Sequence, residues 1–272
     1  MKGIFYILLL YCLPVTSQGL IFNATAFDKR SQLEISRSDK VEEKASLLDY
    51  APSVLSQKGA TCVAISIANA RTILLAKLLN ITNKRDITKF RFSPYWVYMR
   101  NKEEGDLDCS KGLDIEKTLN DLECNGIISA MNFEFPNFYP FTDVSMCNED
   151  VLLIKDVMQE AKKYVVSDVY GIHGLEGIKV SLTKGMPVIV GMITPESFIN
   201  AYSKDIWSPT KSDISGSSFS HAMVIVGYDD NMYGGAVQIM NSWGGSWGNL
   251  GFIWIHYDDL LAYTLGAYAM KD

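Results

Sequence analysis

The spacing of apolar residues changes near Pro187, and this change constrains the fold more than any other feature of the chain. Before it, helical spacing marks three stretches, at 61–80, after Pro94 and at 112–126. After it, turns rich in Gly, Asn, Asp and Ser separate four strand-like runs, at 188–194, 221–228, 236–243 and 251–257. We therefore expect an α+β fold whose first half is helical and whose second half is a sheet.

Two stretches between these halves have patterns of their own. Residues 131–150 are rich in aromatic residues and contain prolines without a steady period, which indicates an irregular connection. Residues 153–183 have helical spacing with a break near Gly171. We therefore expect the second stretch to be helical on both sides of that glycine.

Residues 1–17 have the three parts of a secretory signal peptide: the basic Lys2, an apolar run over 4–15, and small residues ending at Ser17. The apolar run is about a dozen residues long, whereas a membrane-spanning helix needs roughly 20. We expect cleavage after Ser17 and export of a soluble protein, without stable membrane association, to an extracellular, lysosomal or periplasmic compartment. The polar residues 18–51 are then expected to form a surface arm or short leader.

The composition is that of a globular protein. The 272 residues are 48% hydrophobic and 21% charged, which excludes a disordered or collagen-like chain. The formal net charge is −6, and the chain has no block of basic residues that could hold a phosphate backbone. We expect no nucleic-acid partner, and we expect a monomer.

The cysteines that follow the predicted signal peptide are Cys62, Cys109, Cys124 and Cys147. In an oxidising compartment they could form two disulfides, or one disulfide if a thiol is reserved for chemistry, and their number leaves both arrangements open. The sequence contains no C-x-x-C pair and no H-E-x-x-H motif. We therefore expect no metal site and no cofactor.

Cys62 lies at the start of an apolar helical run, where Thr61 is expected to cap the helix. A single cysteine on an apolar helix is usually a buried structural residue. In the first turn, however, backbone N–H groups and the positive end of the helix dipole favour the thiolate, which is the nucleophilic form. Cys62 is therefore a candidate nucleophile.

A thiolate nucleophile needs a proton shuttle, and the chain has three histidines. His173 lies in a turn-like segment and His256 at a strand end, whereas His221 begins a strand-like run that is otherwise apolar. Asn241 could orient the imidazole through its amide oxygen, and Trp243 could shelter that hydrogen bond from water. Each of these residues taken alone could be purely structural. The catalytic hypothesis therefore depends on their occurring together.

The strings around these residues resemble those of the papain-like cysteine peptidases. SHAMVIVGY, which contains His221, is similar to the family's histidine strand, and NSWGGSWGNLGFIWI, which begins at Asn241, is similar to its asparagine segment. SKGLDIEKTLNDLECNGI is similar to the family's glycine-bearing loop and the helix after it, with Gly112 on the substrate side. The resemblance covers about 51–272 and is weak in the middle of that range.

The resemblance implies an architecture of two lobes with a cleft between them. It places a peptidase domain at 52–272, with a helical lobe over about 52–150 and an antiparallel sheet or barrel lobe over about 151–272.

The resemblance also implies a cysteine-type peptidase, by family default an endopeptidase, that acts on proteins or peptides. A Cys62 thiolate and a His221 imidazolium, oriented by Asn241, would form and hydrolyse a thioester. The helix dipole and the imidazolium would lower the pKa of the thiol by several units. The backbone N–H of Cys62 and the side-chain amide of Gln57 would bind the oxyanion, and Trp243 would support the histidine.

The chain departs from the family around the nucleophile. The family's usual C-G-[SA]-C-[WY] is replaced by GATCV around Cys62, so the aromatic residue and the upstream cysteine are missing. Cys109 falls where the partner of that missing cysteine would lie, so the family's bridge cannot form and the remaining pairing stays open. The family's oxyanion glutamine lies six residues before the nucleophile, whereas Gln57 lies five before it and Ser56 lies six before it.

Other functions compete with this hypothesis. A catalytically inactive papain-like homologue could bind peptides, and another thiol enzyme, such as an acyl transferase, would share the cysteine and histidine chemistry. A serine hydrolase is disfavoured because Ser246, in the G-x-S-x-G match, leads into a strand rather than a helix. The leader is also much shorter than the inhibitory propeptides common in the family, so we expect either no autoinhibition or a short blocking arm.

Overall fold

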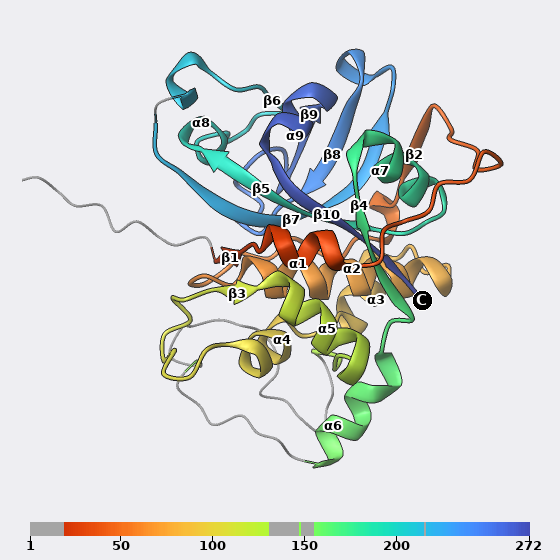
Figure 1. The fold of residues 1–272 in the computed structure, drawn as a ribbon, viewed down its shortest axis with the longest axis vertical. Helices are drawn as coiled ribbons and strands as arrows, with labels where there is room; N and C mark the ends of the chain where they lie inside the picture. The colour runs from red at the N-terminus through yellow and green to blue at the C-terminus, as the bar shows by residue number, and fades with distance from the viewer. Residues whose placement is uncertain (1–18, 131–146, 148–154, 215) are drawn as a thin grey trace, which may run out of the picture.

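The computed structural model describes residues 19–130, 147, 155–214 and 216–272 (Figure 1). The predicted signal peptide, 1–17, lies outside the described residues, as does all of the predicted irregular connection, 131–150, except Cys147.

The helices expected in the first half are present. The helices described there are α1 (Ala24–Lys29), α2 (Cys62–Leu78), α3 (Lys84–Phe90), α4 (Pro94–Asn101), α5 (Ile115–Asn125) and α6 (Lys155–Ala161). Residues 62–74 of α2 are buried because the helix packs against α4 on one side and against strand β7 (Ser218–Asp229) on the other. Figure 1 shows α2 between the strands in one half of the molecule and α4 to α6 in the other.

The N-terminus of α2 agrees only in part with the expectation at Thr61. Thr61 is the N-cap residue, but its hydroxyl donates to the Lys58 carbonyl at 2.9 Å and makes no capping hydrogen bond. Thr61 is therefore the N-cap residue, as expected, but without the side-chain hydrogen bond that such a residue usually makes. Because the threonine oxygen does not accept in the first turn, the backbone N–H groups of Cys62 and Val63 are available to the Cys62 sulfur.

The four expected strands are present as β5 (Val188–Pro195), β7, β8 (Ala236–Met240) and β9 (Phe252–His256). Four more strands join them: β2 (Lys44–Ser46), β4 (Asp168–Ile172), β6 (Ile206–Trp207) and β10 (Thr264–Lys271). Within the described residues these eight strands form one sheet in the order β4-β10-β5-β7-β8-β9-β6, with β2 also paired to β7. Only the β6–β9 pair of this sheet is parallel in the described part of the chain. The α+β expectation is therefore confirmed.

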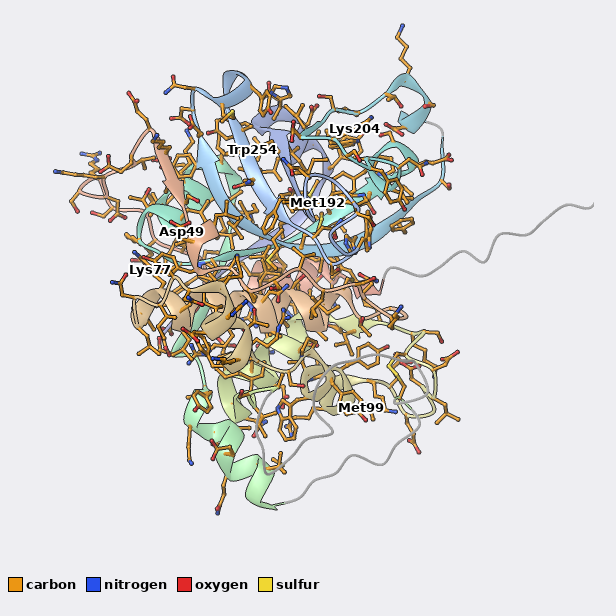
Figure 2. The ribbon with its side chains drawn as sticks, turned by 180° about the vertical axis from the view of Figure 1, so that it is seen from behind. Asp49, Lys77, Met99, Met192, Lys204 and Trp254 are labelled. Atoms are coloured by element: carbon orange, nitrogen blue, oxygen red, sulfur yellow. A yellow bond between two sulfur atoms is a disulfide. The ribbon has the colours of Figure 1, made fainter. Side chains whose placement is uncertain are left out.

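The register of the central strands positions a predicted site residue. Met192 of β5 lies opposite His221 of β7, and Gly191 lies opposite Ala222. Figure 2 places Met192 in the sheet half of the molecule and Met99 of α4 in the helical half.

The helical expectation for 153–183 is partly wrong. α6 and α7 (Gly174–Thr183) are helices, but Asp168–Ile172 between them is β4. This strand pairs with β10, where Tyr268 lies opposite Gly171. Its partner lies about a hundred residues away along the chain, so the local spacing of apolar residues carries no sign of the pairing. The second half also contains the short helices α8 (Glu196–Ile199) and α9 (Tyr257–Tyr263).

The polar residues after the predicted signal peptide are more than a surface arm. They form β1 (Leu20–Ile21), α1 and β2, and they contribute Phe27 and Leu47 to the core, where these side chains are 5% and 2% exposed. β1 pairs with β3 (Leu113–Asp114) in a separate two-stranded parallel sheet. The segment is thus packed against both halves of the molecule.

None of the helices in the described part of the chain combines the length and the apolar character needed to cross a membrane.

Candidate active site

The Cys62 sulfur lies where the helical half meets the sheet. Cys62 is the first residue of α2 and is completely buried. Backbone N–H groups of Ala222, Val63 and Cys62 itself donate toward the sulfur. Since Ala222 directly follows His221 on β7, the packing of α2 on β7 brings the predicted nucleophile and the predicted base to one place.

The pKa of the Cys62 thiol differs from the expectation. Burial raises this pKa from 9.0 to about 12, because the thiolate would lose its hydration in a completely enclosed position. The three backbone N–H groups lower the pKa and only partly offset the effect of burial. The expected lowering is therefore absent in this arrangement, in which the neutral thiol is the stable form.

His221 and Asn241 form a buried pair. The imidazole Nε2 lies 2.7 Å from Oδ1 of Asn241, and the side chains are 0% and 1% exposed. The same oxygen accepts the backbone N–H of Ser242 at 2.7 Å. Two donors converge on this oxygen only if Nε2 carries a proton, so a neutral imidazole would keep Nδ1 as its acceptor atom.

Trp243 covers the imidazole. Its ring stacks on His221 with a centroid separation of 4.5 Å and an interplanar angle of 22°. Trp247 packs edge-on against Trp243 at 5.2 Å and donates from Nε1 to the Phe198 carbonyl at 3.1 Å. Trp243 thus lies against the imidazole, with Trp247 packed behind it.

Gln57 is held beside the asparagine segment. Its backbone N–H donates to the Ser242 carbonyl at 2.7 Å, and its Oε1 accepts the Ser242 hydroxyl at 2.7 Å. Its Nε2 donates to the carbonyl of Gly59, on the loop that leads to Cys62, at 3.0 Å. The shifted glutamine thus connects the Cys62 loop to the asparagine segment.

Gly112 lies beneath the N-terminal segment. It has a φ of 78°, and its N–H donates to the hydroxyl of Tyr98 at 3.1 Å. A Cβ on Gly112 would lie 2.4 Å from the Gly19 carbonyl oxygen, so only glycine fits beside the N-terminal segment at this position. The next N–H, of Leu113, donates to the same Gly19 oxygen at 2.9 Å.

The N-terminal segment also reaches the sheet next to Cys62. A Cβ on Gly19 would lie 2.0 Å from the Ala60 carbonyl oxygen, two residues before Cys62. Leu20 is 7% exposed, and a Cβ on Gly191 would lie 2.8 Å from its Cδ2 atom. Gly191 pairs with Ala222, whose N–H faces the Cys62 sulfur. Residues 19–21, which we call the blocking strand, therefore lie directly beside the candidate site.

Sequence reasoning missed two of these contributions. Ser242 stands inside the quoted NSWG string, and its contact with Gln57 follows only from the fold. Leu20 is an apolar residue in a segment treated as polar, which is a signal that could have indicated burial.

One disulfide is present in the described residues. Cys109 is bonded to Cys147, with the two Cα atoms 5.6 Å apart, while Cys62 and Cys124 are free thiols. This selects one of the two open arrangements, in which a single bridge forms. Within the described residues, no group of three or more His, Cys, Asp or Glu side chains could hold a metal ion.

Comparisons with known proteins agree with the fold. The structure of xylellain, a cysteine protease from Xylella fastidiosa, superposes with a TM-score of 0.74 at 20% identity, over 94% of this chain and 96% of that chain. Procathepsin B S9 from Trypanosoma congolense gives a TM-score of 0.67 at 16% identity, over 93% and 85%. Procathepsin L2 from the larval midgut of Tenebrio molitor gives 0.67 at 18% identity, over 94% and 78%. No curated protein matches the chain by sequence.

A helical half and an antiparallel sheet that meet at a cysteine, a histidine and an asparagine are typical of thiol proteases. Residues 97–268 match the family described as papain family cysteine protease. The chain belongs to this family, and its papain-like fold is confirmed. The matched range contains Gly112, His221 and Asn241 and begins after Cys62, where the sequence departs most from the family pattern.

Proposed function

We propose that the protein is a secreted cysteine endopeptidase that uses Cys62 as nucleophile, His221 as general acid and base, and Asn241 to orient the imidazole. The observation that carries the proposal is the buried 2.7 Å contact between His221 and Asn241, next to the residue whose N–H faces the Cys62 sulfur. An amide oxygen that fixes the tautomer of an imidazole is what a catalytic base needs from its orienting group.

The reaction follows from these groups. The Cys62 thiol gives its proton to Nδ1 of His221, and the sulfur attacks the carbonyl carbon of a peptide bond. The carbonyl oxygen becomes an oxyanion, which the backbone N–H of Cys62 and the amide of Gln57 stabilise. The tetrahedral intermediate collapses to a thioester as the leaving amine takes the proton from His221. Water, deprotonated by His221, then hydrolyses the thioester and restores the thiol.

The blocking strand accounts for the thiol that burial keeps neutral. We propose that residues 19–21 occupy part of the substrate site, against Gly112 and Gly191, and that they leave before substrate binds. Once water and the imidazolium reach the sulfur, the thiolate becomes accessible at lower pH. This proposal keeps the second of the two expectations, a short blocking arm, and sets aside the absence of autoinhibition.

A diverse peptide mixture tests the activity. The wild type, Cys62→Ala and the control Cys124→Ala, which removes the exposed free thiol, are incubated with the mixture, and new termini are identified by mass spectrometry. We expect internal cleavages from the wild type and from Cys124→Ala and none from Cys62→Ala. Peptides retained by the wild type but never cut would instead indicate an inactive peptide-binding homologue.

Gln57→Ala tests the oxyanion site. We expect it to raise the barrier by about 2.7–4 kcal/mol while leaving a measurable rate. An unchanged rate would remove Gln57 from the site.

The blocking strand is tested by placing a charge at two neighbouring positions. Leu20→Asp puts a carboxylate against Gly191, whereas Ile21→Asp changes a side chain that is 40% exposed. We expect Leu20→Asp to release the strand and raise the initial rate of peptide cleavage, and Ile21→Asp to leave the rate near that of the wild type. Equal rates for all three proteins would contradict the block.

The N-terminus of the secreted protein tests the export proposal. A start at Gln18 is expected if the signal peptide is removed after Ser17 and no further cut is obligatory. Size-exclusion chromatography of the same sample tests the proposal that the protein is a monomer.

A further inference from the structure

The loop before Cys62 and the asparagine segment are paired through their main chains. The Gln57 N–H donates to the Ser242 carbonyl at 2.7 Å, and the Gly244 N–H donates to the Leu55 carbonyl at 3.0 Å. Between these contacts Ser56 and Trp243 form an antiparallel bridge. The two segments are therefore joined by backbone hydrogen bonds that need no side chain.

A side-chain contact is added to this backbone pairing. The Ser242 hydroxyl, on a residue that is 2% exposed, donates to Oε1 of Gln57 at 2.7 Å. At the other end of the carboxamide, Nε2 donates to the Gly59 carbonyl at 3.0 Å. A backbone carbonyl only accepts hydrogen bonds, so the nitrogen must lie at the Gly59 end and the oxygen at the Ser242 end.

From this geometry we infer that Ser242 is a positioning residue for catalysis: its hydroxyl holds the Gln57 carboxamide in the one rotation that points the second N–H of Nε2 at the oxyanion. The inference rests on the proposed function, in which Gln57 binds the oxyanion. Nε2 carries two hydrogens, of which Gly59 takes one.

The physical reason is that one hydrogen bond leaves a carboxamide free to rotate. Held only by Gly59, the amide plane can turn about its last side-chain torsion, which has a broad energy profile. A donor aimed at the oxyanion stabilises the transition state only if it is already in place when the charge develops. The Ser242 hydroxyl supplies the second fixed point, on the segment that also carries Asn241.

A purely structural role for the hydroxyl makes different predictions. The backbone pairing of the two segments does not involve the Ser242 side chain, and the N–H that Ser242 donates to Asn241 is also a backbone group. Ser242→Ala therefore leaves the His221–Asn241 pair and the pairing of the segments in place. A structural role would disturb every reaction of Cys62, whereas a positioning role affects only reactions that develop an oxyanion.

The test is a double-mutant cycle of Ser242→Ala and Gln57→Ala, read on a peptide amide substrate with each protein activated in the same way. We expect Ser242→Ala to lower kcat by about 3- to 10-fold with an unchanged KM, and Gln57→Ala to lower kcat by about 100- to 1,000-fold. In the Gln57→Ala background, Ser242→Ala should cause no further loss. The control is Ser56→Ala, which removes the neighbouring exposed hydroxyl and should be silent.

Alkylation of Cys62 by iodoacetamide gives the second readout, because this reaction develops no oxyanion. We expect the same alkylation rate and the same pH profile for the wild type and Ser242→Ala. If Ser242→Ala lowers kcat by the same factor in both backgrounds, or if it slows alkylation as much as hydrolysis, the positioning role is wrong. If the wild type cleaves no peptide, the proposed function fails first, and the inference about Ser242 fails with it.

Discussion

Nε2 of His221 lies 2.7 Å from Oδ1 of Asn241, both side chains are buried, and the Trp243 ring stacks on the imidazole. The strand β7 supplies the imidazole and the turn after β8 supplies the amide, so the contact depends on the pairing of these two strands.

Asn241→Ala is expected to reduce kcat by about 10- to 100-fold, because a hydrogen bond to a group that becomes charged contributes about 1.5–3 kcal/mol. The imidazole loses its fixed tautomer, while Cys62 keeps its position on α2. The measurement is kcat on a peptide amide, with circular dichroism to confirm folding. Asn249→Ala is the control, since Asn249 belongs to the same segment but bonds to Asp205 instead. Equal activity of the wild type and Asn241→Ala would contradict the assigned role.

The raised pKa of Cys62 predicts an unusual pH profile for alkylation of the intact chain. A pKa of about 12 keeps the thiol neutral at physiological pH, so the alkylation rate should rise about tenfold per pH unit from pH 7 to pH 10 without a plateau. In Leu20→Asp, where the blocking strand is released, we expect a faster reaction that levels off at lower pH.

The same shift has a consequence for stability. Because the neutral thiol is favoured in the folded state, it adds to the free energy of unfolding. This stabilisation is fully present below the thiol's unfolded pKa of 9.0 and is lost as the pH rises through about 12.

The assigned protonation state also has a test in the alkylation profile. An alkylation plateau on the acid side of pH 7 in the intact wild type would contradict it.

Arg30 is expected to hold the blocking strand in place. Its guanidinium bonds Glu116 at 2.7 Å and Glu123 at 3.1 Å on α5, and it donates to the Val169 carbonyl on β4 at 3.0 Å. Arg30→Gln leaves the buried Glu116 without its partner and should lower the free energy of unfolding by about 3–5 kcal/mol. It should also speed alkylation of Cys62, because the segment loses the side-chain contacts by which Arg30 joins it to α5 and to β4.

The control for this prediction is Lys29→Gln, which removes an exposed positive charge one residue earlier. Chemical denaturation and iodoacetamide kinetics are measured on both variants. If Arg30→Gln is destabilised without faster alkylation, Arg30 supports the fold but does not hold the strand over the site.

The disulfide is expected to stabilise the helical half. Cys109 and Cys147 are 38 residues apart, and closing a loop of that length in the unfolded chain contributes about 4 kcal/mol by the loop-entropy estimate. The double variant Cys109→Ala/Cys147→Ala should lower the free energy of unfolding by about this amount in denaturant titration. Cys124→Ala, at the exposed free thiol, should change it little. An unchanged free energy of unfolding in the double variant would show that the bridge adds no stability.

Local patterns were sufficient to predict much of this structure. The apolar surface of α2 reflects burial on every side, and the apolar runs of β5 and β7 reflect strands that are buried on both faces. In β9, buried residues alternate with partly exposed ones, so one face of that strand is open. The strings around His221 and Asn241 predicted two residues that the fold brings within 2.7 Å. The sequence predicts these features because each one leaves a pattern among residues that are close together along the chain.

What the sequence missed depends on distant partners. β4 forms because β10 pairs with it, and Leu20 is buried because Gly191 leaves room for it. The raised pKa of Cys62 also depends on residues that are distant in the sequence. The position at a helix N-terminus is visible in the sequence and favours the thiolate, whereas the enclosure that outweighs it arises only when α2, β7 and their neighbours pack together.

The position of β10 governs when the sheet can be completed. This strand lies between β4 and β5, although it is made after every other strand of the sheet. During synthesis, β4 and β5 must therefore wait with unpaired edges until Thr264–Lys271 has emerged. A nascent chain can pair β5, β7, β8 and β9 before β10 emerges, but it cannot complete the sheet. A shortened product that lacks β10 would expose the open edges of β4 and β5 and would be prone to aggregation.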